Sequence, residues 1–271
     1  MLSFPPCKIN LGLHVLAKRA DGYHAIETCF YPVPWSDILE VIRADKFAFT
    51  ASGITVSGKE EDNLCVRAYR LLQQEHGLEP VQIYLHKIIP SGAGLGGGSS
   101  DAAHMLLLLN EVFLLNLSIG KLEQYAAQLG SDCAFFIHHA PMLGSGRGEV
   151  LHAVEHFTLK GFYIVLVKPP VEVSTAAAYA GVTIRPHTMP LGEVLRQPIA
   201  AWRDSLINDF EESIFKAHPE IGLLRQKLYD QGACYAAMSG SGSCVYGLFE
   251  RKPERLDEFS GCTVWSDVLT V

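Results

Sequence analysis

A glycine-rich stretch from Pro90 to Ala103 restricts most strongly what this chain can fold into. Five of the seven residues 92–98 are glycines, so the backbone can turn tightly and approach a ligand without interference from side chains. Residues 99–101 (Ser-Ser-Asp) are of the types that favour a helix N-terminus, and an apolar run follows them. A glycine loop that opens into a helix presents unpaired N–H groups and the positive end of the helix dipole. The stretch therefore predicts a phosphate-binding loop.

Several known phosphate loops do not fit this context. Gly92-x-Gly94-x-x-Gly97 satisfies the dinucleotide pattern, but residues 118–129 read as a helix where a Rossmann unit needs a strand. The Gly-Lys-Ser/Thr ending of a Walker A loop is missing, and so is the lysine strand that follows the loop of protein kinases. A flexible surface linker is the structural alternative, but linkers rarely run from a β-rich segment (81–89) into an apolar helix.

Composition indicates a soluble globular protein. The chain has 271 residues, which is enough for one large or two ordinary domains, with 48% hydrophobic and 19% charged residues. A formal charge of −7 without a basic tract argues against a nucleic-acid partner. The seven cysteines are scattered without a Cys-x-x-Cys spacing, which favours reduced thiols. No signal segment or membrane-spanning run is visible, so we expect a cytoplasmic protein.

Hydrophobic periodicity predicts the main helices and strands. We expect strands at residues 7–16, 23–32, 37–43, 46–50, 81–89 and 161–168, and helices at 63–76, 102–115 and 118–129. In the first strand, Lys8, Asn10, Gly12 and His14 share one face, and Lys8 either reaches solvent or serves a site there. Asp132 follows a glycine and precedes an apolar run, so its local alternative is the N-cap of a short helix.

Two further features have ordinary interpretations. Arg147 lies in the flexible turn at residues 143–149, which we expect beside the nucleotide; we interpret it as a solvated hairpin tip, with a contact to phosphate as the alternative. The pair His138 and His139, with His152 and His156, lacks the context of a metal site, and we expect ordinary surface or strand residues.

The pattern Pro-x-x-x-Gly-Leu-Gly-x-x-Ser-Ser-x-Ala at 90–102 resembles the phosphate loop of the GHMP kinases (galacto-, homoserine, mevalonate and phosphomevalonate kinases). The fuller string at 94–103 is most similar to the branch that phosphorylates 4-diphosphocytidyl-2-C-methyl-D-erythritol in non-mevalonate isoprenoid synthesis. Other strings match the family in the same order along the chain. The strand motif with Lys8 precedes the glycine stretch, and the Asp132 segment, residues 208–211 and a second glycine loop at 238–245 come after it. The resemblance therefore covers nearly the whole chain.

This resemblance implies an α+β, two-domain GHMP kinase fold. Residues 1–157 would form the N-terminal ATP-binding domain, and residues 158–271 a ferredoxin-like C-terminal domain that contributes to the substrate pocket. It also implies Lys8 and Asp132 as catalytic residues, and Ser99 or Ser100 as a ligand of Mg²⁺. The residues that would bind ATP are Pro90, Ser91, Gly92, Ala93, Gly94, Leu95, Gly96, Gly97, Gly98, Ser99 and Ser100. Those that would bind the substrate are Asn10, Tyr23, His24, Thr175 and Tyr179. Residues 208–211 are interpreted as structural.

The implied reaction is transfer of a phosphoryl group from ATP to the 2-hydroxyl of the substrate, giving the 2-phosphate and ADP. The expected partner is a small molecule with a cytidine diphosphate group, without nucleic acid or membrane, and the expected assembly is a monomer or weak homodimer. A GHMP kinase for another small alcohol, such as homoserine or mevalonate, is the alternative within the class. From other classes, a nicotinamide oxidoreductase and a nucleotide-binding regulator without catalysis remain open.

Overall fold

The computed structural model describes residues 1–56, 58–155 and 157–271, and the chain packs into two compact units. The first unit collects residues 1–7, 35–91 and 96–139, and the second collects residues 8–34, 92–95 and 140–271. Each unit is therefore discontinuous in sequence. The expected boundary between sequence domains at residues 157 and 158 stays a prediction.

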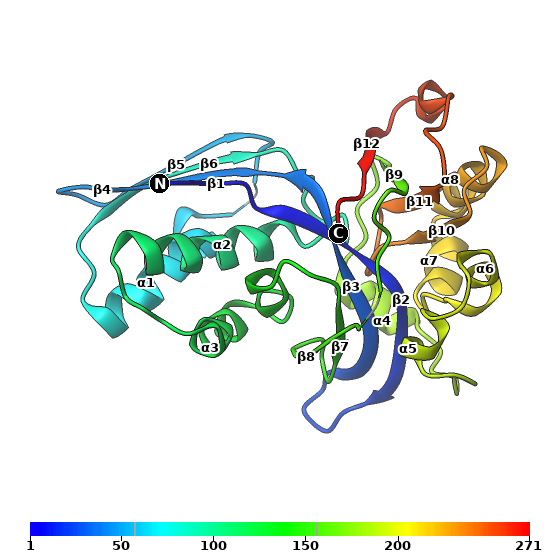
Figure 1. Ribbon diagram of the computed structural model, residues 1–271, viewed down its shortest axis with the longest axis horizontal. Coiled ribbons are helices and arrows are strands. Elements are labelled where there is room, and N and C mark those ends of the chain that lie inside the picture. The colour runs from blue at the N-terminus through cyan, green and yellow to red at the C-terminus, as the bar shows by residue number, and fades with distance from the viewer. Residues whose placement is uncertain (57, 156) are drawn as a thin grey trace. The chain divides into compact units, whose positions relative to one another are not determined.

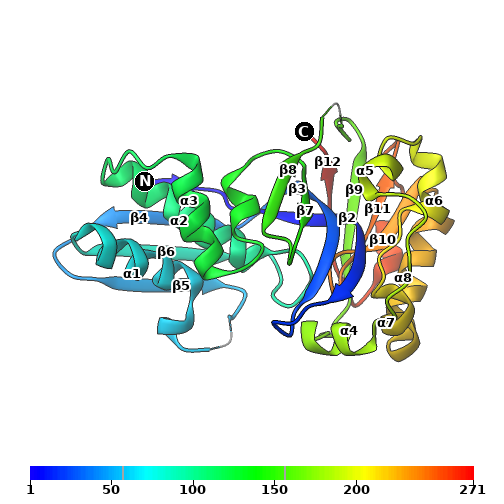
Figure 2. The same ribbon diagram turned by 90° about the horizontal axis from the view of Figure 1, so that it is seen from below.

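The first unit is a sheet with helices on one face (Figures 1 and 2). Its strand order is β1-β4-β6-β5, in which β5 alone runs parallel to its neighbour. The strands are β1 (Leu2–Ser3), β4 (Ile38–Arg43), β5 (Ala48–Gly53) and β6 (Val81–Lys87). The helices are α1 (Leu64–His76), α2 (Gly97–Val112) and α3 (Ile119–Leu129), with short 3₁₀ helices η1 (Glu60–Asp62) and η2 (Ala134–Ile137).

Helices α1 and α3 confirm the sequence-based predictions because both carry local start and stop signals. The side chain of Asn63 accepts the N–H of Cys65 at the start of α1, and Gly77 ends that helix in the left-handed conformation. Ser118 caps α3 in the same way through Lys121, and Gly130 follows the last helical residue. These caps are readable from sequence since each lies within a few residues of the helix it ends.

Helix α2 begins earlier and ends earlier than predicted. It starts at Gly97, inside the glycine run, with Gly96 at the N-cap in the left-handed conformation that glycine adopts without strain. It ends at Val112, because Leu114 and Asn116 have positive φ angles of 53° and 55° that an α-helix does not admit. Residues 99–101 thus lie inside the helix and do not cap it.

The second unit holds two four-stranded sheets. One has the order β2-β3-β7-β8, with β2 (Pro6–Lys18), β3 (His24–Ser36), β7 (Met142–Ser145) and β8 (Val150–Ala153). The other is antiparallel with the order β10-β11-β9-β12, formed by β9 (Tyr163–Lys168), β10 (Tyr235–Met238), β11 (Val245–Phe249) and β12 (Thr263–Val268). This second order is that of a ferredoxin-like sheet and confirms the predicted α+β fold.

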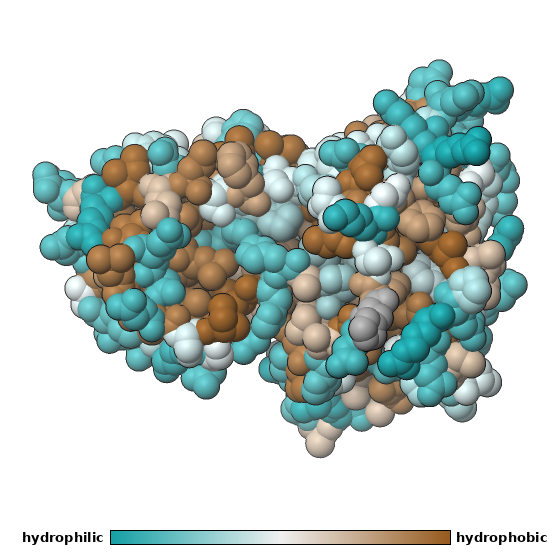
Figure 3. Space-filling model, viewed as in Figure 1, coloured by the Kyte–Doolittle hydropathy of each residue, from teal (hydrophilic) through white to brown (hydrophobic). Residues whose placement is uncertain are grey.

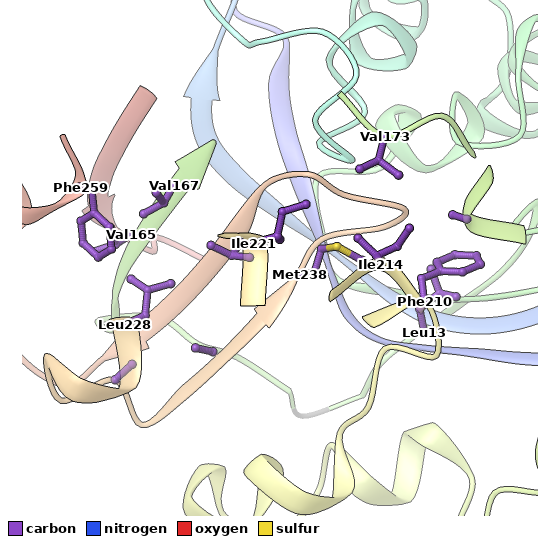
Figure 4. Packing of buried hydrophobic residues seen from close by; sticks show 14 of the residues in the cluster. Leu13, Val165, Val167, Val173, Phe210, Ile214, Ile221, Leu228, Met238 and Phe259 are labelled. Carbon is purple, nitrogen blue, oxygen red and sulfur yellow. The ribbon is translucent and has the colours of Figure 1, made fainter. Parts of the chain in front are cut away.

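Helices connect these strands, and α8 packs on β10 and β11 of the ferredoxin-like sheet. The helices are α4 (Thr175–Gly181), α5 (Leu191–Val194), α6 (Trp202–Ser205), α7 (Glu211–Ala217) and α8 (Pro219–Asp230), with η3 (Ile199–Ala201) and η4 (Leu256–Phe259). Figure 4 shows Ile221 and Leu228 of α8 beside Val165, Val167 and Met238 of the sheet. All five side chains are buried, and full burial of an aliphatic side chain contributes about 1.5–3 kcal/mol.

All seven cysteines are free thiols, in agreement with the sequence prediction. Cys234 and Cys262 are half-buried, and the remaining five are buried. No helix among the described residues is long and apolar enough to cross a membrane. The visible surface mixes hydrophilic with hydrophobic residues (Figure 3).

Candidate active site

Part of the glycine stretch is held against the second glycine loop, and both lie in the second unit. The hydroxyl of Ser239 donates to the carbonyl oxygen of Gly94 over 2.8 Å, and the N–H of Cys244 donates to that of Ala93 over 3.2 Å. Gly94 has a φ of +74°, and a Cβ atom there would lie 2.0 Å from the Ser239 carbonyl oxygen. Only glycine allows this approach of the two backbones.

The second glycine loop connects β10 to β11 and is itself fixed by residues 208–211. The Nδ2 of Asn208 donates to the carbonyl oxygens of Met238 (2.8 Å) and Gly240 (2.9 Å). The carboxylate of Glu211 accepts the N–H of Met238 over 2.7 Å. These contacts support the structural interpretation of this segment.

Lys8 is directed at the glycine stretch and not at solvent. Its side chain is 3% exposed, and its Nζ donates to the carbonyl oxygen of Gly94 (3.0 Å) and to Oδ1 of Asn10 (2.5 Å). The ammonium also lies 5.4 Å from the centre of the Phe30 ring. Asn10 is held in turn by a 2.9 Å hydrogen bond from its Nδ2 to the hydroxyl of Thr28. The solvated-face interpretation of Lys8 is therefore wrong.

Asp132 lies in the first unit, in a turn that faces the start of α2. A Cβ on Gly130 would lie 4.0 Å from the Ser99 hydroxyl, and that hydroxyl also bonds to the thiol of Cys133. Asp132 itself is half-buried, and its Oδ1 accepts a 3.2 Å hydrogen bond from Ser131. Cys133, in a helical conformation, directly precedes η2, and its side chain forms no cap. The N-cap interpretation of Asp132 stays a prediction.

The two serines offered as magnesium ligands differ in accessibility. Ser100 is fully buried, whereas Ser99 is half-exposed in the first turn of α2. No cluster of three or more His, Cys, Asp or Glu side chains among the described residues could hold a metal ion. A hydroxyl oxygen suits Mg²⁺, which commonly takes few protein ligands and completes its shell with phosphates and water. Ser99 therefore fits this ion, and the burial of Ser100 argues against it.

The first unit also contains a cavity of about 520 Å³ that the sequence motifs do not indicate. It is lined by β5, by the segment that leads to α1 and by Ser91 and Gly98 of the glycine stretch. Asn63, Lys87 and Asp101 also face it. The polar run at residues 58–63 was the available signal, but it reads equally well as an ordinary turn.

The candidate substrate residues gather in the second unit. The rings of His24 and Tyr179 are stacked with centres 4.7 Å apart, and the hydroxyl of Thr175 lies 3.3 Å from that of Ser241 in the second glycine loop. Tyr23 is 57% exposed, and the guanidinium of Arg147 lies 4.9 Å from its ring centre. Arg147 is thus half-exposed, as expected at a hairpin tip, but it also covers an aromatic ring.

Two of the four histidines considered for a metal site, His138 and His139, have structural contacts. His138 pairs with Glu123 over 2.6 Å, and the ring of His139 packs edge-on against that of His104. His152 lies in β8, and His156 lies outside the described residues.

Comparisons with known proteins agree with these motifs. Residues 63–140 match the model of the GHMP kinases N terminal domain, and residues 193–259 that of GHMP kinases C terminal. A "4-diphosphocytidyl-2-C-methyl-D-erythritol kinase" of Cytophaga hutchinsonii is 50% identical over 258 residues, covering 95% of this chain and 96% of its own. A protein of the same name from Bacteroides thetaiotaomicron is 54% identical over 256 residues, or 92% of each chain.

Solved structures are similar over the whole length. A crystal structure of 4-(cytidine 5'-diphospho)-2C-methyl-D-erythritol kinase has a TM-score of 0.84 and 31% identity, with all of both chains covered. The mevalonate kinase of Methanococcus jannaschii has a TM-score of 0.74, covering 100% of this chain and 98% of its own. Its identity is 14%, so that likeness concerns the fold alone.

Proposed function

Because this chain belongs to the GHMP kinase family, in the branch of the 4-diphosphocytidyl-2-C-methyl-D-erythritol kinases, we propose that it phosphorylates the 2-hydroxyl of that substrate with ATP. The products are the 2-phosphate and ADP, and the reaction belongs to the non-mevalonate route to isopentenyl diphosphate. Among the features of this chain, the contact of the buried Lys8 ammonium with the glycine stretch carries the proposal.

The glycine stretch binds the ATP phosphates. Gly96 offers no side-chain cap to α2, so the first N–H groups of this helix and its positive dipole end are available to an anion. The cavity beside Ser91 and Gly98 has room for the nucleoside, and we assign the adenosine of ATP to it. Ser99 would hold Mg²⁺, which supplies charge neutralisation at the phosphates.

Lys8 and Asp132 have different chemical tasks. Phosphoryl transfer needs partners held in line and charge that is neutralised, because its transition state is loose. The Lys8 ammonium stabilises negative charge on the attacking oxygen or on the transferred group. Asp132 accepts or orients the proton of the substrate hydroxyl.

The cytidine group is assigned to the aromatic residues of the second unit. Tyr23 presents a large exposed ring on which a base can stack, and His24 offers a donor and an acceptor to its polar edge. Tyr179 and Thr175 of α4 lie beside His24 and Ser241, and Asn10 complements Lys8. In this arrangement, stacking on the Tyr23 ring contributes affinity for the base, and the hydrogen bonds of His24 to the polar edge of the base contribute specificity for cytosine.

Substitution of Asp132 tests the chemistry. Asp132→Asn should lower kcat by roughly a thousandfold, since a positioned acid–base group contributes a factor of about 10²–10⁴. ATP binding, measured by calorimetric titration, should stay close to that of the wild type. Asp45→Asn removes an exposed carboxylate of the same unit and is the matched control. Retention of most activity by Asp132→Asn would remove this residue from the catalytic role.

A substrate comparison tests the specificity. Phosphate transfer should be observed with 4-diphosphocytidyl-2-C-methyl-D-erythritol and be at least a hundredfold slower with homoserine or mevalonate. Transfer to either of these at a comparable rate would favour another GHMP activity. ATP binding without any transfer would favour a regulator, and binding of NADH in place of ATP would favour an oxidoreductase.

A further inference from the structure

Three buried charged side chains lie beneath the glycine stretch in the first unit, and the proposed chemistry uses none of them. Asp37, Lys87 and Asp101 are 0%, 4% and 3% exposed. The Nζ of Lys87 donates to Oδ2 of Asp101 over 2.6 Å and to Oδ2 of Asp37. We call these three residues the charge cluster. Burying three charges is costly unless each is paired, so a cluster of this kind calls for a specific explanation.

The charge cluster connects the two ends of the glycine stretch. On the entry side, Oδ1 of Asp37 accepts the N–H groups of Ile88 and Ile89, which directly precede Pro90. On the exit side, Asp101 is the fifth residue of α2, directly after its first turn. Lys87, at the end of β6, bridges these two carboxylates.

The charge cluster also borders the cavity assigned to the nucleoside. Both Lys87 and Asp101 line it, together with Ser91 and Gly98. The charged residues on the other walls of this cavity, Lys59, Glu60 and Asp62, are exposed. A displacement of the start of α2 relative to β6 would therefore change the cavity and the phosphate-binding N–H groups together.

The two carboxylates of the charge cluster are not equivalent. Asp37 has three donors, namely Lys87 and two backbone N–H groups. Asp101 has Lys87 on one oxygen, and its Oδ1 is buried without a hydrogen-bond partner in the part of the chain that the structure describes. A neutral amide should therefore replace Asp101 more easily than Asp37.

Lys87 is the member on which the connection depends. Burial alone would lower the pKa of its ammonium, but the carboxylates of Asp101 and Asp37 outweigh that effect and raise it. The ammonium therefore stays charged. Its removal would break the link between the entry segment and α2 and leave two carboxylates without their cation.

We propose that Lys87 is a positioning residue for ATP, which holds the entry to the glycine stretch and the N-terminal part of α2 at the separation that the phosphates and the nucleoside need. This inference rests on the proposed function, because it requires ATP at the glycine stretch. Lys87 acts through the backbone it fixes, with Asp37 as its anchor on one side and Asp101 on the other.

The first experiment is Lys87→Met, studied by steady-state kinetics and by titration with a non-hydrolysable ATP analogue. The dissociation constant of the analogue and the KM for ATP should rise about ten- to hundredfold, as expected for loss of a charge-assisted contact. The KM for the phosphate acceptor should stay within about twofold of the wild type. A merely structural role would instead lower the folded fraction, and so the apparent kcat, without raising the KM for ATP.

Two further variants separate positioning from stability. The first variant combines Lys87→Met with Asp101→Leu, so that apolar side chains replace both members of the ion pair. Because no unpaired carboxylate is left at position 101, the midpoint of thermal unfolding should be higher than in Lys87→Met alone. The weak binding of ATP should persist because the connection is still missing. Lys87→Arg keeps the positive charge and the hydrogen-bond donors. Its dissociation constant for the ATP analogue should therefore lie clearly closer to that of the wild type than the dissociation constant of Lys87→Met does.

Lys46→Met removes an exposed lysine of the same unit outside the cavity and should leave both KM values unchanged. Normal ATP affinity in the double variant, or an equal rise of both KM values in Lys87→Met, would overturn the positioning role. Failure of the wild-type protein to bind the ATP analogue would instead overturn the proposed function itself.

Discussion

The two glycine loops of this chain have similar compositions but differ in whether their backbone N–H groups are used within the loop. The first, at residues 92–98, opens into α2 through Gly96, which offers no side-chain cap to the N–H groups that follow. The second, at residues 239–243, is closed on itself: Ser239 and Gly242 donate their N–H groups to the carbonyl oxygens of Cys244 and Ser239. The first loop is therefore suited to bind an anion, and the second to support its neighbour.

The supports of the two loops differ as well. The first is anchored by the charges of Asp37, Lys87 and Asp101, whereas the second is held by direct hydrogen bonds from the amide of Asn208 and to the carboxylate of Glu211. A loop that keeps its N–H groups unpaired for a ligand cannot stabilise itself, so its position must be fixed from outside. A loop whose groups are paired internally needs only to be held in place.

The largest effect should come from Gly94→Ala, where the two loops touch. The left-handed φ costs about 1–2 kcal/mol for a residue other than glycine, and the overlap with Ser239 forces the backbones apart. We expect a loss of about 4 kcal/mol in unfolding free energy, with weaker ATP binding, by urea denaturation and ligand titration.

Gly92→Ala is the matched control for that substitution. Its φ is also positive, at +61°, but an added Cβ would meet no atom within 4 Å. It should cost only about 1–2 kcal/mol. Equal losses in the two variants would show that backbone conformation alone, and not the contact between the loops, requires glycine at position 94.

Asn208→Ala should have the next largest effect. It leaves the carbonyl oxygens of Met238 and Gly240 buried without their donor, which should cost about 3 kcal/mol of unfolding free energy. Gln226→Ala, on an exposed side of α8, should cost less than about 0.5 kcal/mol. If the two variants unfold at similar urea concentrations, the amide of Asn208 is not the support of the second loop.

The pH dependence of stability should show the contribution of His14, a residue of β2 that lies beside residues 208–209. Its ring stacks on that of His187 at 3.5 Å, and Glu27 and Asp209 are the nearby carboxylates. Burial, and then the neighbouring His187, lower the pKa of His14 from 6.5 to about 4. A lowered histidine pKa means that the unfolded chain binds the proton more tightly, so stability is lost as the pH falls from about 6.5 to 4.

We expect this loss to be about 2 kcal/mol between pH 7 and pH 4.5. It should be smaller in His14→Gln, as measured by urea denaturation at both pH values. An unchanged difference between the two pH values in this variant would assign the acid sensitivity to other groups, among them the buried His104.

Ser239→Ala should have the smallest effect. The hydroxyl donates to Gly94 and accepts the N–H of Asn10, so its loss should cost about 1–2 kcal/mol. It should also raise the KM for ATP several-fold, because the glycine stretch loses one anchor. Ser241→Ala, at the tip of the same loop, should leave the KM for ATP unchanged and thus distinguish the anchor from the tip.

Much of the fold was predictable because its signals are local. The caps Asn63 and Ser118 and the glycines that end α1 and α3 fix those helices within a few residues. The predicted start of α2, at residue 102, is wrong because glycine has a low helix propensity and the glycine run therefore reads as a loop. The structure begins the helix inside that run, after Gly96 in the left-handed conformation.

The site was only partly predictable, because its remaining parts depend on contacts between distant segments. Asp37, Lys87 and Asp101 come together only through the register of β4 with β6 and the packing of α2. The environment of Lys8 depends likewise on residue 94, far along the chain. Strand alternation identifies the face that Lys8 shares but does not reveal what covers it.

The distribution of the cysteines has a practical consequence. The thiols of Cys65 and Cys133 are buried in the first unit and those of Cys29 and Cys244 in the second, and burial raises the pKa of Cys133 to about 11 and of Cys244 to about 12. Such thiols react with alkylating reagents only when the surrounding structure opens. Cys234 and Cys262 are half-buried and should be labelled in the native state. Mass spectrometry of time-resolved alkylation would therefore record the opening of each unit separately, without any introduced probe.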